Sequence, residues 1–326
     1  MNNKLILLAL PILLLAAAGN ACAAVVTPGE SLQQAVLAEV DQFCVFHKQR
    51  EELVVQATVK LPDQAGSIDR IAFVIPVPGT PDSAVLESAP VLRDIRAFTR
   101  RSSFGLPAPP EVVGEEQPSV ISAGSKGPLS DALNRWLALN GLQTIRLERL
   151  RPYDDGEWSF VVQRAYTSGY SGNVLLRPVR ISFNTRNIVF PLRLMQNDEK
   201  LVCRLAVMTK GSLNTEPLEE HGFALGESAG PVRLAQLPES VEMLVNRAGS
   251  RFSVFKELRR GNVYLFSAAA EVHDAAWDSE ITIAEPRIPL LSTMQNILAV
   301  GAAVAVVLLM NRAKKKTNGD SNGGSE

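Results

Sequence analysis

The chain has 326 residues, of which 46% are hydrophobic, with a formal net charge of −1 and a sequence pI near 6.4. Without its two apolar ends, about 260 residues remain, which is enough for one large domain or two small ones. A nearly neutral chain offers no basic field for a phosphate backbone, so we expect no nucleic-acid partner.

The N-terminus has the pattern of an export signal. Lys4 supplies the positive start, Leu5 to Ala18 is an almost uninterrupted apolar run, and Ala21-Cys22-Ala23 suits a signal peptidase. We predict a signal peptide over residues 1–23, cleaved after Ala23. Two alternatives stay open. One is a short uncleaved membrane helix, although about 14 apolar residues fall below the roughly 20 that cross a bilayer. The other is lipidation of Cys22 as the first mature residue.

The C-terminal region resembles a membrane anchor. Pro289 to Met310 contains no charged residue, and at about 1.5 Å per residue it would reach roughly 33 Å, enough for a hydrocarbon core. We predict a single transmembrane helix over residues 288–311, with a buried core helix as the alternative. Arg312 and the lysines that follow mark the cytoplasmic side, so residues 312–326 form a basic, disordered cytoplasmic tail. The membrane is thus an expected partner, and the domain before the span is extracytoplasmic.

The cysteines leave two readings. If Cys22 departs with the signal, Cys44 and Cys203 remain as a pair in an oxidising compartment, which permits a disulfide. The alternative, of almost equal weight, is two separately buried thiols.

The predicted extracytoplasmic domain contains mostly strand patterns. Leu53 to Leu61 alternates apolar and polar residues, which predicts a half-buried strand. Ile71 to Ile75 is an apolar run that we expect to end in a rigid loop from Pro76 to Pro81. Later strand-like segments are Trp158 to Tyr166, Val174 to Phe183, Ile188 to Leu194, Leu201 to Met208, Val232 to Leu237, Phe252 to Leu258 and Asn262 to Ala268.

Two helices and a linker interrupt these strands. Helical spacing from Val91 to Phe98 predicts a short amphipathic helix, and a second should run from a cap at Ser130 to the stop at Asn140-Gly141. Residues 105–128 have the composition of a flexible linker, dividing a first half (24–104) from a second half (129–287). The expected fold class is α+β, a mainly antiparallel β ectodomain with a few short helices and one C-terminal transmembrane helix.

Several phrases of the sequence resemble one bacterial family. Glu51-Glu52-Leu53-Val54-Val55-Gln56, then Ile71-Ala72-Phe73-Val74-Ile75-Pro76-Val77-Pro78, then Trp158-Ser159-Phe160-Val161-Val162 are similar to the family catalogued as domain of unknown function 2330. The chain lacks the cysteine-rich Gly-Gly-Phe-Phe phrase with which many members begin. The resemblance covers roughly residues 30 to 210 and implies export and topology. It implies no activity and no functional residue.

A search for chemistry finds no strong motif. There is no His-Glu-x-x-His, no phosphate-binding glycine loop and no serine in a recognisable nucleophile-elbow context, so we predict no cofactor and no metal. The weak candidates for a metal or acid–base site are Asp154, Asp155 and Glu157, which otherwise form a turn, and His273, which could share a strand face with Glu271 or lie at a solvated edge.

The sequence therefore favours a non-enzymatic protein of the bacterial cell envelope. The leading hypothesis is a membrane-anchored domain that binds a partner, such as an envelope protein, or supports envelope structure. The alternative is an exported hydrolase or metal-dependent enzyme whose site is assembled from residues far apart in the chain.

Overall fold

A computed structural model of the chain describes residues 24–29, 34–63, 68–88, 90–99, 112–113, 116–123, 127–154, 157–195, 200–226, 229–272, 277 and 279–286. The predicted signal peptide, the predicted span at 288–311 and the predicted tail lie outside these residues. Within the described ranges, no helix is both long enough and apolar enough to cross a membrane.

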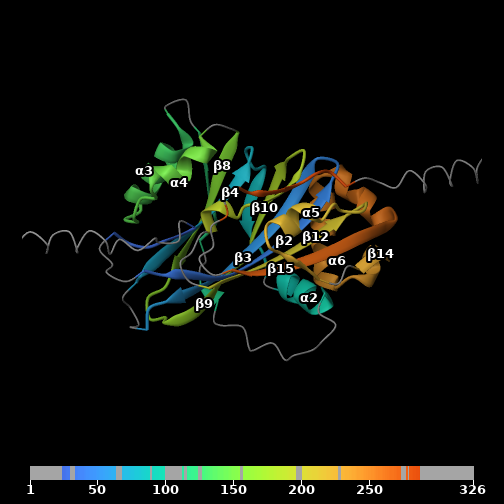
Figure 1. Ribbon diagram of the computed structural model, residues 1–326, viewed down its shortest axis with the longest axis horizontal. Helices are drawn as coiled ribbons and strands as arrows, with labels where there is room; N and C mark the ends of the chain where they lie inside the picture. Colours follow the sequence, from blue (N-terminus) through green and yellow to red (C-terminus); the bar gives the residue numbers. More distant parts are fainter. Residues whose placement is uncertain are drawn as a thin grey trace, which may run out of the picture. The chain divides into compact units, whose positions relative to one another are not determined.

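The largest sheet is built around a long hairpin (Figure 1). Strands β2 (Val36–His47) and β3 (Arg50–Leu61) pair antiparallel through a turn at Lys48 and Gln49, whose φ angles are 50° and 60°. Two consecutive positive φ angles are typical of the type I′ turn, whose twist suits a hairpin. Strand β12 (Leu201–Thr209) adds to β2 in parallel.

The remaining strands extend this sheet to both sides. Its order is β13-β15-β12-β2-β3-β10-β5, with β14 also on β15, β9 also on β3 and β6 on β9. These strands are β5 (Ser83–Leu86), β6 (Val112–Val113), β9 (Gly172–Leu176), β10 (Val179–Asn184), β13 (Ala224–Leu225), β14 (Ala229–Arg233) and β15 (Asn262–Val272).

A second sheet shares a core with one face of the large one. Its order is β1-β4-β8-β7, made by β1 (Val25–Val26), β4 (Arg70–Pro78), β7 (Ser119–Ser122) and β8 (Trp158–Tyr166). Phe46 and Val55 of the large sheet belong to the same buried cluster as Phe73 and Phe160 of the second. A two-stranded sheet of β11 (Ile188–Phe190) and β16 (Ile281–Ile283) adds to this core.

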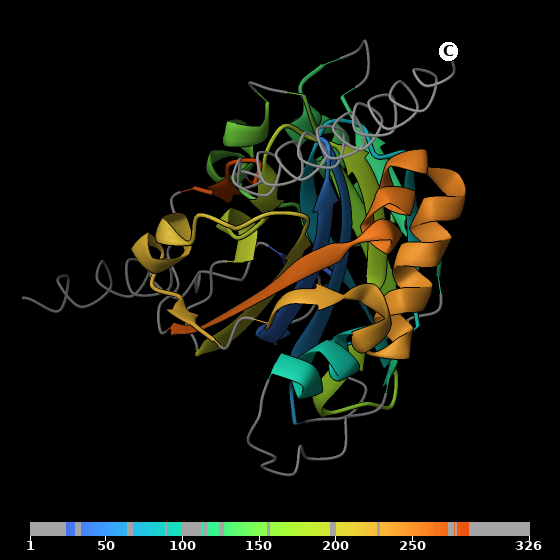
Figure 2. The same ribbon diagram turned by 90° about the vertical axis from the view of Figure 1, so that its right-hand side faces the viewer.

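The opposite face of the large sheet is covered by helices (Figure 2). Helices α2 (Pro90–Thr99) and α6 (Glu239–Arg251), with the 3₁₀ helix η4 (Ser253–Arg260), bury Phe43, Val45 and Met208 of the sheet. The other helices are α3 (Leu129–Leu139), α4 (Leu147–Leu150), α5 (Glu216–Glu220), η1 (Arg151–Tyr153), η2 (Arg193–Met195) and η3 (Leu234–Gln236).

The described residues thus form an α+β fold with mainly antiparallel strands, as predicted. The strands of the two predicted halves are interleaved, since β3 pairs with β10 and β4 pairs with β8. By its contacts, the chain up to Pro286 forms one compact unit. Residues 119–122 of the predicted flexible linker form the edge strand β7, so this part of the linker belongs to a sheet.

Several local predictions were wrong. The predicted strands Ile188 to Leu194 and Val232 to Leu237 are cut short, because β11 ends at Phe190 before η2, and β14 ends at Arg233 before η3. Phe252 to Leu258 is not a strand: Phe252, Phe255 and Leu258 recur every three residues, which is the period of the 3₁₀ helix η4. The predicted loop at Pro76 to Pro78 is part of strand β4, which pairs with β8 there. The pairing with β1 on the other side ends at Phe73. These residues therefore have one open edge, where a strand tolerates proline. Pro128, not Ser130, occupies the N-cap of α3.

Candidate functional site: a pocket beside an arginine and aspartate cluster

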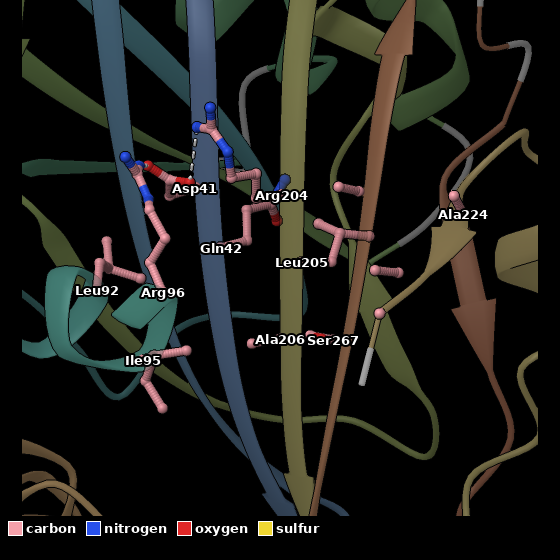
Figure 3. Close-up of a pocket in the computed structure, with 13 residues that line it drawn as sticks. Asp41, Gln42, Leu92, Ile95, Arg96, Arg204, Leu205, Ala206, Ala224 and Ser267 are labelled. Atoms are coloured by element: carbon pink, nitrogen blue, oxygen red, sulfur yellow. Dashed lines mark hydrogen bonds and ion pairs between the residues drawn. The ribbon is translucent and has the colours of Figure 1, made fainter. Parts of the chain in front are cut away.

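A pocket opens on the helix-covered side of the large sheet, at the place where the helical cover ends (Figure 3). Its cavity volume is about 170 Å³. Strands β2, β12 and β15 form its floor, α2 lies on one side, and the edge strand β13 lies on the other. Residues from five parts of the chain therefore meet here.

The sequence of β2 explains why the pocket lies at this point. Phe43 and Val45 face α6 and η4 within the helix-side core. Because side chains alternate along a strand, Asp41 and Glu39 continue the same face. Charged residues at this end of the strand do not suit an apolar helix contact, so the sheet surface stays open beside α2.

Asp41 lies at the centre of a charged cluster. One carboxylate oxygen of Asp41 contacts Nη2 of Arg96 on α2, and the other accepts a hydrogen bond from Nη1 of Arg204 on β12 at 3.3 Å. The same Nη1 donates to Glu39 at 2.7 Å. Burial raises the pKa of Asp41, and the two guanidiniums, which act to lower that pKa, compensate only in part.

The rest of the pocket surface is small and apolar. Leu92 and Ile95 of α2 face Ala206 and Ala269 across the floor. Gly226 is required at the rim, because a Cβ at this position would lie 2.4 Å from Oγ of Ser267. An apolar floor with a few convergent polar groups is the usual composition of a small-molecule site.

A second cluster of arginine and carboxylate groups lies on the same side of the sheet, under α6. Nε of Arg180 donates to Glu87 at 2.9 Å, and its Nη1 donates to Glu52 at 3.3 Å. Glu52 also accepts from Oγ of Ser182 at 2.8 Å, and Glu87 accepts from Arg247 of α6 at 2.9 Å. The side chains of Arg180, Glu52 and Glu87 are at most 5% exposed, so this cluster is closed to ligands.

Glu51 lies on the opposite face of β3, inside the core between the two sheets. Its carboxylate accepts the Val189 N–H at 3.2 Å, and the thiol of Cys44 lies beside it. Burial raises the pKa of Glu51 to about 8, although both neighbours act to lower that pKa. Glu51 is therefore a carboxylic acid held neutral near physiological pH.

Of the predicted acidic site, Asp154 makes a structural contact. Asp154 accepts hydrogen bonds from the backbone N–H and the hydroxyl of Ser130, at 2.8 and 2.7 Å, and so ties η1 to the first turn of α3. Glu157 is exposed, and Asp155 lies outside the described residues. No group of three or more potential metal ligands occurs among the residues that the structure describes.

His273 also lies outside the described residues, so its predicted relation to Glu271 is not addressed. Glu271 itself forms an ion pair with Lys200 at 2.6 Å.

Cys44 and Cys203 are both buried and form no disulfide with each other. On the parallel pair β2 and β12, Cys203 lies opposite Val40 and Cys44 lies opposite Val207. Four residues of stagger amount to roughly 13 Å along the strands, well beyond the Cα separation of about 7 Å that a disulfide tolerates. The geometry corresponds to the second of the two predicted alternatives and does not support the disulfide.

One further pair of side chains has a geometry used in catalysis. Nδ1 of His221 lies 2.7 Å from the carbonyl oxygen of Pro217, and Nε2 lies 3.2 Å from Oγ of Ser279. A carbonyl only accepts, so in the neutral ring Nδ1 carries the proton and Nε2 accepts the Ser279 hydroxyl. Nε1 of Trp277 donates to the carbonyl oxygen of His221 at 3.4 Å and holds this turn.

Sequence reasoning missed the residues of the pocket. Asp41, Arg96 and Arg204 come from two strands and a helix, and the pairing of β2 with β12 that joins them is parallel and distant in sequence. The one available signal was the interruption of an apolar run by Asp41, in a stretch to which no strand was assigned.

Comparisons with known proteins find one family model that matches part of the chain and two solved structures of low similarity. No curated protein matches the chain. Two solved structures are similar. The crystal structure of baculovirus P35 has 10% identity and a TM-score of 0.44, and the match covers 78% of this chain and 97% of that chain. A mutated baculovirus P35 after caspase cleavage has 9% identity and a TM-score of 0.37, and the match covers 77% of this chain and 100% of that chain. The model of the bacterial family described as "Uncharacterized protein conserved in bacteria (DUF2330)" matches residues 111–235, and the resemblance expected from the sequence is confirmed over this part of the chain.

Proposed function

We propose that this protein is an extracytoplasmic binding protein of the bacterial envelope, and that its pocket takes a small carboxylate with a short apolar part. The observation that carries the proposal is the position of Arg204 and Arg96, beside Asp41, at a cavity whose remaining lining is mostly apolar. Guanidinium groups bind carboxylates through paired, charge-assisted hydrogen bonds, while apolar walls accept the remainder of such a ligand.

The geometry of Arg204 supports a ligand of this charge. Its Nη1 serves both Glu39 and Asp41, while Nη2 and Nε form none of the hydrogen bonds among the described residues, and its side chain is 19% exposed. A guanidinium presents five N–H donors, so donors remain for a carboxylate. A cavity of about 150 Å³ accepts a ligand of six carbon atoms, which points to acids about as small as butyrate.

The test is a titration of the full-length protein with butyrate and with its neutral counterpart, butyramide. We expect heat of binding with butyrate and at least about tenfold weaker binding with butyramide, because one charge-assisted contact is worth about 1.5–3 kcal/mol. Arg204→Met should abolish the difference, whereas Arg135→Met, which alters an exposed arginine of α3, should not. Equal binding of both compounds, or of neither, would refute the proposal.

The localisation follows from the two ends of the sequence. The predicted signal over residues 1–23 and the predicted span over 288–311 would place residues 24–287 outside the cytoplasmic membrane. The full-length protein should stay in the membrane pellet under alkaline carbonate, and a chain ending at Pro286 should be released. Added protease should reach the domain in spheroplasts, and protection of the domain would contradict this orientation.

A second candidate function is ester hydrolysis, favoured by the contact between His221 and Ser279. A serine hydroxyl bonded to a neutral imidazole, itself oriented by an acceptor, is the arrangement that activates a nucleophile. A fluorophosphonate tests this directly: Oγ of Ser279 would bond to phosphorus, fluoride would leave, and His221 would take the proton. Loss of labelling in Ser279→Ala would support ester hydrolysis, provided that labelling is kept in Ser250→Ala. Ser250 is an exposed serine whose hydroxyl donates to a backbone carbonyl. No labelling of the parent protein would exclude this function.

A further inference from the structure

One end of the large sheet concentrates positive charge. The pairing registers place His47 of β2, Arg50 of β3, Asn184 of β10 and the start of β15 at this same end, because β12 runs parallel to β2 while β3 and β15 run opposite to them. The loops beyond these strand ends carry five basic residues, here called the cationic end: Lys48, Arg186, Lys210, Arg259 and Arg260.

Contacts confirm that these loops lie side by side. The N–H of Thr185 donates to the carbonyl oxygen of Gln49 at 2.9 Å, which joins the turn carrying Arg186 to the turn carrying Lys48. A Cβ on Gly261, the residue after Arg260, would lie 2.9 Å from Nζ of Lys210. Lys48 in turn reaches Glu257 of η4 at 2.6 Å.

The charge of this end is not balanced locally. Glu257 accepts Lys48 and His47, and Asp82, near the same strand ends, is engaged by Arg50 at 2.6 Å. Of the cationic end, Lys48, Arg186, Arg259 and Arg260 are exposed and Lys210 is half-buried. In a chain whose formal net charge is −1, a surface of this kind is a local excess.

The shape of the cationic end indicates the class of partner. Its loops follow β10, β3, β2, β12 and β15, which are neighbours in the sheet, and at about 4.8 Å between strands they span roughly 19 Å. The pocket described above is lined by other residues. Lys48 is paired with Glu257. The other four cations, spread over such a width, match a broad anionic surface better than a single small anion.

We infer that the cationic end rests on a bilayer containing anionic phospholipid. Lysine and arginine side chains at such a surface each contribute to binding, and the attraction acts within about one Debye length of the headgroups. The inference concerns a different surface from the ligand pocket and does not depend on it.

The test uses the full-length protein with a fluorophore on Gln49→Cys at the hairpin turn. Lipid vesicles carry a quencher on the headgroup. One set is made of phosphatidylcholine alone, and the other of phosphatidylcholine mixed with the anionic phosphatidylglycerol. The matched label is Asn173→Cys, which lies beside Lys60 at the far end of β3, roughly 34 Å along the strand. We expect quenching at position 49 in the anionic vesicles, reversal by salt, and little quenching at position 173.

Charge reversal provides the decisive control. Arg259→Glu with Arg260→Glu should weaken the quenching at position 49, by ~5-fold or more in apparent affinity for each basic residue lost. Arg135→Glu with Arg146→Glu, two exposed arginines near α3 and α4, should leave it unchanged. Three outcomes would each overturn the inference: equal quenching at both labels, quenching that does not depend on phosphatidylglycerol, and no quenching at position 49. If the fluorophore at position 49 responds to polyglutamate but not to vesicles, the surface binds an acidic polymer and the inference is overturned.

Discussion

Two clusters of arginine and carboxylate groups lie on the same side of the large sheet, and they differ in what covers them. Under α6, the side chains of Arg180, Glu52 and Glu87 are 5%, 0% and 2% exposed. Beside α2, the side chains of Arg204 and Arg96 are 19% and 24% exposed, around a carboxylate of Asp41 at 8%. The same chemistry is thus closed in one place and open in the other.

The difference shows how one set of residue types can serve two purposes. In the closed cluster, protein groups satisfy the charge of Glu87: burial acts to raise its pKa, but the Ser88 N–H and the guanidiniums of Arg247 and Arg180 together hold that pKa below its ordinary value. A buried pair of this kind is costly to break and offers nothing to a ligand. In the open cluster, incomplete cover leaves donors at a cavity, which is what recognition requires.

The largest effect is expected from breaking the closed cluster. Arg180→Met would leave Glu52 and Glu87 buried without their shared cation, and breaking a buried ion pair costs about 3–5 kcal/mol. Urea unfolding of the full-length protein should show this loss as a lower midpoint. Arg186→Met, at an exposed site, should change stability by less than about 0.5 kcal/mol. Adding Glu52→Gln to Arg180→Met should restore part of the loss, and a single variant as stable as the parent would show that the cluster is not structural.

The next effect concerns Glu51, the neighbour of Glu52 on the opposite face of β3. Its pKa of about 8 lies above the ordinary 4.5 of an unfolded chain, so the folded protein binds one more proton between these values. The free energy of unfolding should therefore fall as pH rises through this window, by up to about 1.4 kcal/mol per pH unit. Glu51→Gln should remove that slope and be the more stable protein near pH 8. Parallel pH profiles for the two proteins would contradict the assignment.

A smaller effect is expected at the open cluster, and it should appear in binding. Burial raises the pKa of Asp41, and protonation of Asp41 would neutralise one of the two carboxylates that Nη1 of Arg204 serves, which makes the side of the cavity more positive. Affinity for propanesulfonate, an anion across the whole range, should fall as pH rises through the pKa of Asp41. Asp41→Asn should keep the affinity of the low-pH form throughout. A pH dependence that survives in this variant would place the titrating group elsewhere.

Much of this fold was predictable from local patterns. Strand β8 has the predicted limits, Trp158 and Tyr166, and α2 contains the predicted helical stripe from Val91 to Phe98. Alternation failed at β3 for a physical reason. Gln56 and Thr58 looked solvent-facing, but both are buried, and Gln56 donates a hydrogen bond to the carbonyl oxygen of Leu176. Helix α6 was not predicted at all, although its buried stripe of Val241, Leu244, Val245 and Ala248 has helical spacing.

The candidate site was less accessible to sequence reasoning than the fold. Its charged residues are joined by tertiary pairing alone, since Asp41 and Arg204 are 163 residues apart in the chain and belong to adjacent parallel strands. In contrast, the acidic motif was visible in the local sequence, and of its residues Asp154 contacts Ser130 while Asp155 lies outside the described residues. A charged residue next to apolar neighbours has the same local pattern whether it faces solvent, a buried arginine or a pocket.

The smallest effect is expected from the cysteines, and it tests the register that joins the open cluster. If β12 pairs with β2 as observed, Cys44 and Cys203 are staggered by four residues and cannot bond without sliding one strand past the other. Reducing agent should therefore leave the unfolding midpoint of the full-length protein unchanged. Both cysteines should react with a thiol reagent in denaturant without prior reduction. A midpoint that falls on reduction would require a shifted register, and the same shift would separate Arg204 from Asp41 and dismantle the pocket.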